Sequence, residues 1–187
     1  MAVTTLDQNT ALIVIDLQNG IVALPTAHPT GEVVQKSRVL LDAFRARRLP
    51  VVLVNVAGVA PGRNEQPRHS GEFPAGWTDL VPELNQQPQD HLVTKRTWGA
   101  FTGTDLQQYL KGRGVTQVVI VGVATSIGVE STARQASELG LNVTFGVDAM
   151  TDLNADAHHN SITRIFPRLG ETGTTQEIVA LLEQTRA

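Results

Sequence analysis

The segment 117–139 constrains the fold more than any other part of the chain. It reads QVVIVGVATSIGVESTARQASEL and begins with an unbroken β-branched run, which is typical of a strand covered on both faces. Residues 122–127 then form a tight turn, and a helix of small residues opens near Gly128. This succession predicts an open α/β sheet. In such folds the positive helix ends and the ligands lie at the carboxyl edge of the strands.

Apolar runs and helical spacings alternate along the rest of the chain, as in βαβ units. The expected strands are 11–17, 51–56, 92–95, 118–121, 142–147 and 168–171, and the expected helices are 33–47, 104–113, 128–139, 156–166 and 175–185. A chain of 187 residues without repeats suits one domain with a substantial core. We therefore predict a single domain over 1–187, with three α/β/α layers and a six-stranded, mostly parallel, Rossmann-like sheet.

Composition limits which binding partners and which catalytic chemistries this chain can have. A net charge of −3 without a basic stripe argues against nucleic-acid binding. No apolar run is long enough to span a membrane, and no signal peptide is visible, so the cytoplasm is the expected compartment. Cysteine is absent altogether, which excludes disulfides, thiolate metal sites and a cysteine nucleophile.

The segment 57–90 is rich in glycine and proline and is long for a connection within a compact domain. Connections of this length are often functional. It carries His69, Phe73 and Trp77. Two interpretations are open for the aromatic residues: they form a wall or lid over the carboxyl edge, or they anchor the loop to the body. His69 is expected at the surface.

Two charged residues stand at the ends of expected strands. Asp16 ends the first strand and Lys95 the third, and burial of either charge is costly unless it is paired or functional. We expect both to meet the turn before Gly128 and to form a partly buried ion pair in a pocket. Because desolvation offsets the attraction in such pairs, the pair favours a functional role over a stabilising one.

Several common sites are excluded by their missing motifs. The chain has no GxGxxG after the first strand, no GxxxxGK[ST] and no GxSxG, which disfavours a dinucleotide enzyme, a nucleoside triphosphatase and a serine hydrolase. The first strand ends in DLQ, with one carboxylate and no second at two residues on. That pattern weakens a metal-assisted phosphotransfer site.

Three motifs in this order resemble the isochorismatase-like hydrolase superfamily: ALIVIDLQNG, VTKRTWGAFTGTDL and VIVGVATSIGVESTARQASELGLNVT. The resemblance extends from about residue 10 to residue 170. Most of this superfamily are cysteine amidohydrolases, such as nicotinamidases, which use an Asp–Lys–Cys triad. By motif, Asp16 and Lys95 match the first two members, and Gly128 stands where those enzymes have the cysteine. Ser126 and Ser131 lie nearby but do not occupy that position.

True isochorismatases also carry a glycine at this point, and they cleave a vinyl ether without a covalent intermediate. In that chemistry the aspartate donates a proton to the enol-ether carbon, and water attacks the resulting oxocarbenium carbon. A lysine beside Asp16 would lower the pKa of its carboxyl, which opposes the acid role. A substrate carboxylate that neutralised Lys95 would relieve this, so the resemblance favours a small anionic substrate.

The resemblance further implies a non-proline cis peptide between Val123 and Ala124 and an anion-binding turn built from the backbone N–H groups of Ala124 and Gly128. True isochorismatases read Tyr-Ala-His where this chain has alanine, Thr125 and serine, so the substrate pocket must differ. Substrate or oxyanion contacts are accordingly expected from Val123, Ala124 and Thr125.

Trp98 and Phe101 either line the substrate pocket or pack their loop against a neighbouring subunit. His158 and His159 are expected to be solvated or at an interface. Family nicotinamidases bind a metal through aspartate and histidine residues after the second strand, but residues 55–72 contain no D-x-H, so neither a metal nor a cofactor is predicted. Family members are usually dimers or tetramers, which implies a homo-oligomer.

Three functions remain open from the sequence. The leading one is a hydrolase without a thiol, in which Asp16 is the acid or base, Lys95 tunes it and holds a carboxylate, and the turn 124–128 binds an oxygen. The second is a catalytically silent ligand-binding or scaffold protein that kept the fold. The third is an amidase that activates water directly through Asp16, without the two-step route. The presence of both charged residues favours an enzyme.

Overall fold

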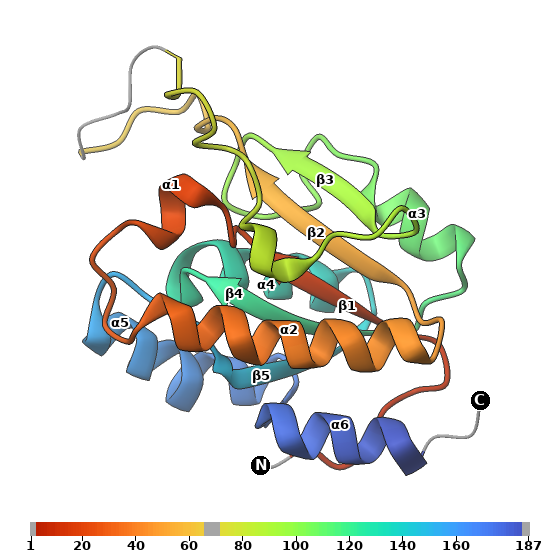
Figure 1. Cartoon of the computed structure of the whole chain (residues 1–187). Helices are drawn as coiled ribbons and strands as arrows, with labels where there is room; N and C mark the ends of the chain where they lie inside the picture. Colours follow the sequence, from red (N-terminus) through yellow and green to blue (C-terminus); the bar gives the residue numbers. More distant parts are fainter. Residues whose placement is uncertain (1–2, 66–71, 185–187) are drawn as a thin grey trace.

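The computed structural model describes residues 3–65 and 72–184, so His69 lies outside the described residues. One sheet of six strands runs through the molecule in the order β3-β2-β1-β4-β5-β6, and every neighbouring pair is parallel (Figure 1). The strands are β1 Thr10–Ile15, β2 Val51–Val56, β3 His91–Lys95, β4 Gln117–Val123, β5 Asn142–Thr151 and β6 Glu171–Gly173. The expected α/β fold with a parallel sheet is confirmed.

Helices cover both faces of this sheet. The α-helices are α1 Asn19–Val22, α2 Thr30–Ala46, α3 Leu106–Gly112, α4 Glu130–Glu138, α5 Ala155–Asn160 and α6 Thr175–Gln184. Short 3₁₀ segments are η1 Pro82–Leu84 and η4 Phe166–Arg168, and π-helical segments are η2 Thr125–Val129 and η3 Ser161–Ile165. In Figure 1, α2 and α6 lie in front of the sheet and α4 lies behind it.

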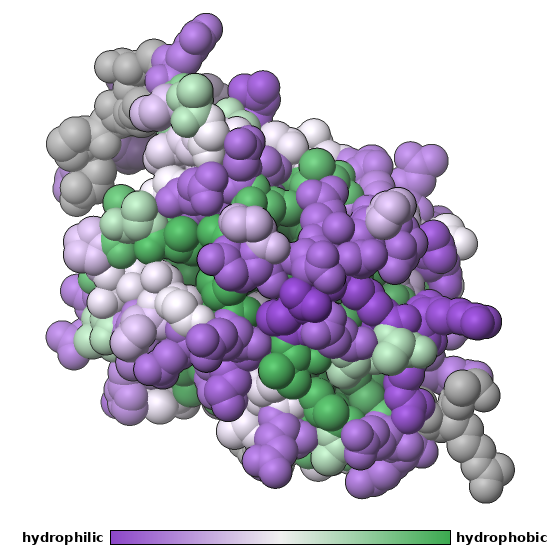
Figure 2. Space-filling model, viewed as in Figure 1, coloured by the Kyte–Doolittle hydropathy of each residue, from purple (hydrophilic) through white to green (hydrophobic). Residues whose placement is uncertain are grey.

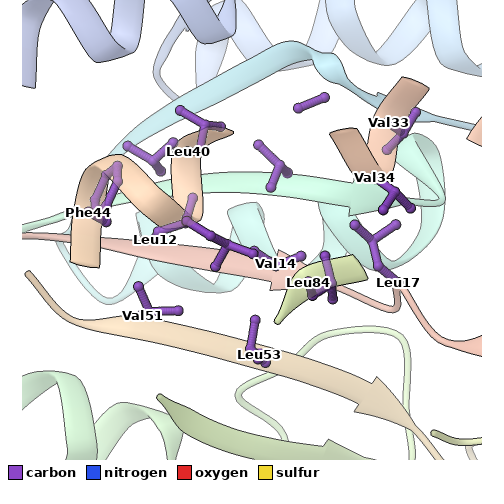
Figure 3. Close-up of a cluster of buried hydrophobic side chains, with 14 of the residues drawn as sticks. Leu12, Val14, Leu17, Val33, Val34, Leu40, Phe44, Val51, Leu53 and Leu84 are labelled. Carbon is purple, nitrogen blue, oxygen red and sulfur yellow. The ribbon is translucent and has the colours of Figure 1, made fainter. Parts of the chain in front are cut away.

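The two faces of β1 bury different side chains. Leu12 and Val14 belong to the cluster under α2 and α6, whereas Ile13 and Ile15 belong to the cluster under α3 and α4. Figure 3 shows the first cluster, in which Leu12 and Val14 lie close to Leu40 and Phe44 of α2. Successive strand side chains point to opposite faces, and both faces here are covered. This is why the strand reads as a continuous apolar run.

The helix α2 is amphipathic, with apolar side chains toward the sheet and mostly polar ones outward. Figure 2 shows that hydrophilic side chains predominate on this face of the molecule, with hydrophobic ones exposed in patches between them. Val33, Leu40 and Phe44 of α2 are turned inward and are at most 2% exposed, while Val39 is 49% exposed. Among residues 3–65 and 72–184, no helix is both long and apolar enough to cross a lipid bilayer.

The chain changes faces between β1 and β4, which are neighbours in the sheet. After β1 it passes to α2 on one face, and after β4 it passes to α4 on the other. In open parallel sheets the crevice at such a switch point, outside the carboxyl ends of the strands, is where ligands bind. Asp16 and η2 both lie at this crevice, because each directly follows one of the two strands.

Some local expectations differ from the structure. The expected helix 156–166 is divided into α5, η3 and η4, and the helix expected from Gly128 begins as the π-helical η2 before α4. The strand expected at 168–171 forms at 171–173 instead, because η4 prolongs the helical path to Arg168. The four-residue α1 was not expected.

The long connection after β2 is tied to α1. The rings of Phe73 and Trp77 are stacked with centroids 4.2 Å apart, and the Trp77 indole lies where a side chain on residue 20 would be. The Gly20 N–H group donates a hydrogen bond of 2.9 Å to the Trp77 carbonyl. Of the two interpretations of these aromatics, the structure therefore favours anchoring for Trp77.

Replacement of Gly122 by alanine is expected to lower the free energy of unfolding by about 3 kcal/mol. Gly122 has φ 120°, pairs with Ile15 in the sheet, and approaches the Ile15 carbonyl so closely that an added Cβ would collide with it. The matched control is Gly31→Ala in α2, where an added Cβ meets nothing within 4 Å. Urea unfolding of the two variants checks this, and equal midpoints would contradict it.

Candidate functional site

Asp16 is held at the carboxyl edge by an unusual backbone conformation. Its φ of 53° lies in the left-handed region, which aspartate tolerates better than most residues. Its N–H group donates to the Val54 carbonyl at 2.9 Å. Two residues on, the buried Gln18 amide donates to the Val56 carbonyl at 3.0 Å and accepts from the Val56 N–H at 2.7 Å. These bonds to β2 hold the end of β1 and present the Asp16 carboxylate to the crevice.

Lys95 reaches Asp16 across the end of β2, which lies between their strands. Its Nζ is 2.7 Å from Asp16 Oδ2, with only 2% and 7% of the two side chains exposed, so the expected ion pair is present. The same Nζ donates to the Trp98 carbonyl at 2.9 Å and to the Thr97 carbonyl at 3.3 Å. An ammonium group has three donors. All three are engaged within the protein, and direct contact of Lys95 with a substrate carboxylate stays a prediction.

Gly128 faces this pair from the other side of the crevice. An ideal Cβ at residue 128 would lie 3.2 Å from Asp16 Oδ2 and 3.4 Å from Lys95 Nζ. The Thr132 hydroxyl fixes the turn by donating to the Gly128 carbonyl at 2.7 Å and accepting from the Ala100 N–H at 3.1 Å. The three residues that the motifs singled out are thus brought together, and no side chain projects from Gly128 toward the carboxylate.

The carboxyl of Asp16 is poised to exchange a proton near neutral pH. Burial raises its pKa from 3.8 to about 6, although the charge and hydrogen bond of Lys95 act in the opposite direction. The expectation that Lys95 lowers this pKa is confirmed for the contribution of the lysine, but desolvation of the carboxylate outweighs that contribution and the net shift is upward. Within the described residues, Asp16 Oδ1 is buried and has no hydrogen-bond partner.

The segment between β4 and α4 forms the third part of the site. The peptide bond between Val123 and Ala124 is cis, at the place where the resemblance put it. Val123 is buried, and Ala124 packs against the cluster under α2. Thr125 is fully buried, and its hydroxyl lies 2.7 Å from His158 Nδ1 rather than in contact with Asp16.

His158 and Asp152 are contacts of the site that the sequence interpretation missed. His158 is half-buried and its Nδ1 lies 2.7 Å from the Thr125 hydroxyl, so the expectation that it is solvated is corrected, and a place at an interface stays a prediction. Asp152 accepts a 2.7 Å hydrogen bond from the Ser126 N–H group. Its position directly after β5 was a usable signal, because it repeats the placement of Asp16 after β1. His158 had no such signal.

Trp98 and Phe101 have different surroundings. Trp98 is 63% exposed, and its backbone carbonyl accepts a hydrogen bond from Lys95 Nζ. Phe101 lines a hollow of about 350 Å³ with Leu110 and Leu141. This hollow lies beside α3 and the end of α4, and a role of Phe101 in the substrate pocket or at a subunit interface stays a prediction.

In the ranges 3–65 and 72–184, no three histidine, aspartate or glutamate side chains are grouped so that they could hold a metal ion. The loop after β2, where family nicotinamidases place their metal ligands, includes residues 66–71, which lie outside the described residues. The absence of a metal and of a cofactor accordingly stays a prediction.

The raised pKa of Asp16 predicts a specific pH dependence of stability. Because the folded state binds this proton more tightly than the unfolded state, the stabilisation is complete below about pH 3.8 and is lost as pH rises to about 6. Relative to Asp16→Asn, the wild type should lose about 2 kcal/mol between pH 4 and pH 6.5, at about 1.4 kcal/mol per pKa unit. Urea unfolding of both proteins at several pH values measures this, and parallel pH profiles would contradict it.

Comparison with known proteins places this site in a family. The Isochorismatase domain model matches residues 10–177. The uncharacterized isochorismatase family protein YwoC of Bacillus subtilis is 44% identical over 96% of this chain and 95% of its own. A solved isochorismatase family protein from Burkholderia thailandensis, also 44% identical, superposes with a TM-score of 0.92 and covers 96% of this chain and 98% of its own.

More distant relatives have named activities. Nicotinamidase 3 of Arabidopsis thaliana is 30% identical, and the alignment covers 83% of this chain and 79% of that protein. The domain match includes Asp16, Lys95 and the whole of η2. The solved Burkholderia thailandensis protein shares the fold over 96% of this chain. The chain therefore belongs to the isochorismatase family.

Proposed function

We propose that this chain is a hydrolase that uses Asp16 as a general acid and needs no thiol nucleophile. One observation carries the proposal: a buried carboxyl with a pKa of about 6 and an unpartnered oxygen faces the bare backbone at Gly128. General acids work best when their pKa lies near the working pH. Burial of this kind is how enzymes keep a carboxyl protonated in that range.

The charge of the site favours a small anionic substrate. When Asp16 is protonated, the ammonium of Lys95 leaves the buried pair with one positive charge. All three Lys95 donors are engaged within the protein, so the attraction on a substrate carboxylate acts through space. We assign direct binding of a substrate oxygen to the backbone N–H groups of Ala124 and Gly128, with Val123 and Thr125 holding that turn in place.

Hydrolysis of the vinyl ether of isochorismate is the reaction that we propose to test first. Asp16 would transfer its proton to the terminal enol-ether carbon, which becomes a methyl group. Water then adds to the neighbouring oxocarbenium carbon and gives up a proton that restores Asp16. The resulting hemiketal breaks its ether bond and releases pyruvate and an alcohol. No step requires a nucleophile from position 128.

A second candidate is a catalytically silent member that binds a ligand or serves as a scaffold. The observation that favours it is the closure of the site, since Asp16 and Lys95 are only 5% and 2% exposed. An amidase in which Asp16 activates water is a third candidate, supported by the similarity to a protein named nicotinamidase. Both lack the support that the proton-donating carboxyl gives to the first.

The deciding experiment measures pyruvate release from isochorismate by the purified protein between pH 5 and pH 9. If protonated Asp16 is the acid, kcat/KM should fall about tenfold per pH unit above pH 6. Ammonia release from nicotinamide is measured beside it. Absence of pyruvate would exclude isochorismate, ammonia would favour the amidase, and absence of both would favour the scaffold.

A further inference from the structure

The turn 124–128, which faces Asp16, is hydrogen-bonded to two residues of the segment after β5, His158 and Asp152. We call these contacts the clasp. Thr125 Oγ1 and His158 Nδ1 are 2.7 Å apart, and the adjacent Ser126 N–H donates to Asp152 Oδ2 at 2.7 Å. Asp152 Oδ1 accepts in turn from the Asn154 N–H at 3.1 Å. Two successive residues of the turn are thus held by the segment after β5, while Gly128 of the same turn is held by Thr132 of α4.

A third segment, the loop before α2, closes on the same cluster. The ring of His28 lies with its centroid 4.7 Å from the His158 ring at an angle of 55°. His28 Nδ1 is 3.0 Å from Thr151 Oγ1, and the Ala27 N–H donates to the Asp152 carbonyl at 2.8 Å. The His158 ring is therefore fixed on two sides, by Thr125 at its Nδ1 and by His28 against its face.

We propose that His158 is a positioning residue of the site: through the Thr125 hydroxyl it holds the turn that carries Gly128 against the carboxylate of Asp16. The link to Asp16 is the packing of the turn, since an ideal Cβ on Gly128 would lie only 3.2 Å from Asp16 Oδ2. Packing of the turn at this place contributes to the burial that raises the pKa of Asp16. The inference rests on the proposed role of Asp16 as an acid. It adds the residue that keeps the Asp16 carboxyl buried and therefore able to act as an acid.

The surroundings of His158 favour the neutral form of its ring. Burial and the neighbouring His28 and His159 lower its pKa, and only Asp152 acts in the opposite direction. A neutral ring protonated at Nε2 accepts the Thr125 hydroxyl proton at Nδ1, which fixes the orientation of that hydroxyl.

The test follows the Asp16 carboxyl by ¹³C NMR titration in four proteins: wild type, His158→Ala, His158→Asn and His159→Ala. Loosening of the turn in His158→Ala should admit water and lower the pKa of Asp16 from about 6 toward 3.8, by at least about half a unit. Asparagine can place a hydrogen-bonding atom near the Nδ1 position, so His158→Asn should restore the value. The exposed neighbour His159 serves as the matched control, and its variant should titrate like the wild type. An unchanged pKa in His158→Ala overturns the inference.

Kinetics separate this inference from the proposed function. With a substrate that the wild type hydrolyses, His158→Ala and Thr125→Val should each lower kcat about tenfold with little change in KM, and the double variant should be no worse than either single one. Additive losses overturn the clasp. If the pKa of Asp16 shifts as expected but no protein turns over isochorismate, the positioning role stands and the proposed reaction fails. If isochorismate is turned over and His158→Ala changes neither kcat nor the pKa of Asp16, the proposed reaction stands and the positioning role of His158 fails.

Discussion

Replacement of Asp16 by asparagine is expected to lower kcat/KM for vinyl-ether hydrolysis by about 10²–10⁴-fold. Asparagine keeps the size of the side chain and can still accept a hydrogen bond from Lys95 Nζ, which lies 2.7 Å from Asp16 Oδ2 in the wild type. It cannot deliver a proton to the substrate carbon. The loss should fall mainly on kcat, because the proton moves only in the transition state.

The measurement is the rate of pyruvate release across the pH range, for the variant and the wild type side by side. The variant should also lose the fall in rate above pH 6, since that fall reports the ionisation of Asp16. Asp42→Asn in α2 is the matched control, because its carboxylate is 54% exposed and pairs only at the surface with Arg38 and Arg45. A variant with wild-type kcat would remove Asp16 from the mechanism.

Replacement of Lys95 by methionine is expected to lower the free energy of unfolding at pH 7 by about 3–5 kcal/mol. Methionine has a similar length but no charge, so the Asp16 carboxylate loses its only ion-pair partner in the described part of the chain. The carbonyls of Thr97 and Trp98 lose the donor that now reaches them. The pKa of Asp16 should rise further above 6, because Lys95 is what holds it down.

Urea unfolding and the ¹³C titration of Asp16 measure these two effects. Lys36→Met is the matched control: its ion pair with Asp148 has a distance of 3.3 Å, but 49% of the lysine side chain is exposed. Its loss should cost at most about 1 kcal/mol. The double variant Asp16→Asn, Lys95→Met should recover part of the stability. Equal costs for the two lysines would mean that the buried pair is no more than a surface contact.

The sequence was informative about the fold because periodicity and turn chemistry are local. The buried strands β1, β2 and β4 were identified from continuous apolar runs, which are the direct record of burial on both faces. The capping box at the start of α6 is visible as Thr174 and Glu177, and the structure has both of its hydrogen bonds. A similar pattern at Thr104 and Gln107 forms no such box, since the Thr104 hydroxyl donates to the Ala100 carbonyl and accepts from the Leu106 N–H.

The candidate site was predicted in part for the same reason. Asp16 and Lys95 stand at strand ends, and the carboxyl ends of parallel strands meet at one edge. His158 could not be found in this way, because its partner Thr125 is 33 residues away and the ring lies on a short helix with no periodic pattern. The division of the expected helix 156–166 into α5, η3 and η4 was equally hidden.

The sequence by itself determined the parallel α/β architecture, the family, the absence of a thiol and the residues that could hold charge at the carboxyl edge. Only the tertiary structure decided how those charges behave. Attraction to Lys95 can be inferred from a motif, but the desolvation that outweighs it depends on every group packed around the carboxyl. The engagement of all three lysine donors and the clasp of Thr125 by His158 are likewise set by distances between remote segments. The burial of a side chain depends on every segment that packs around it in the fold, so it cannot be read from a local sequence pattern.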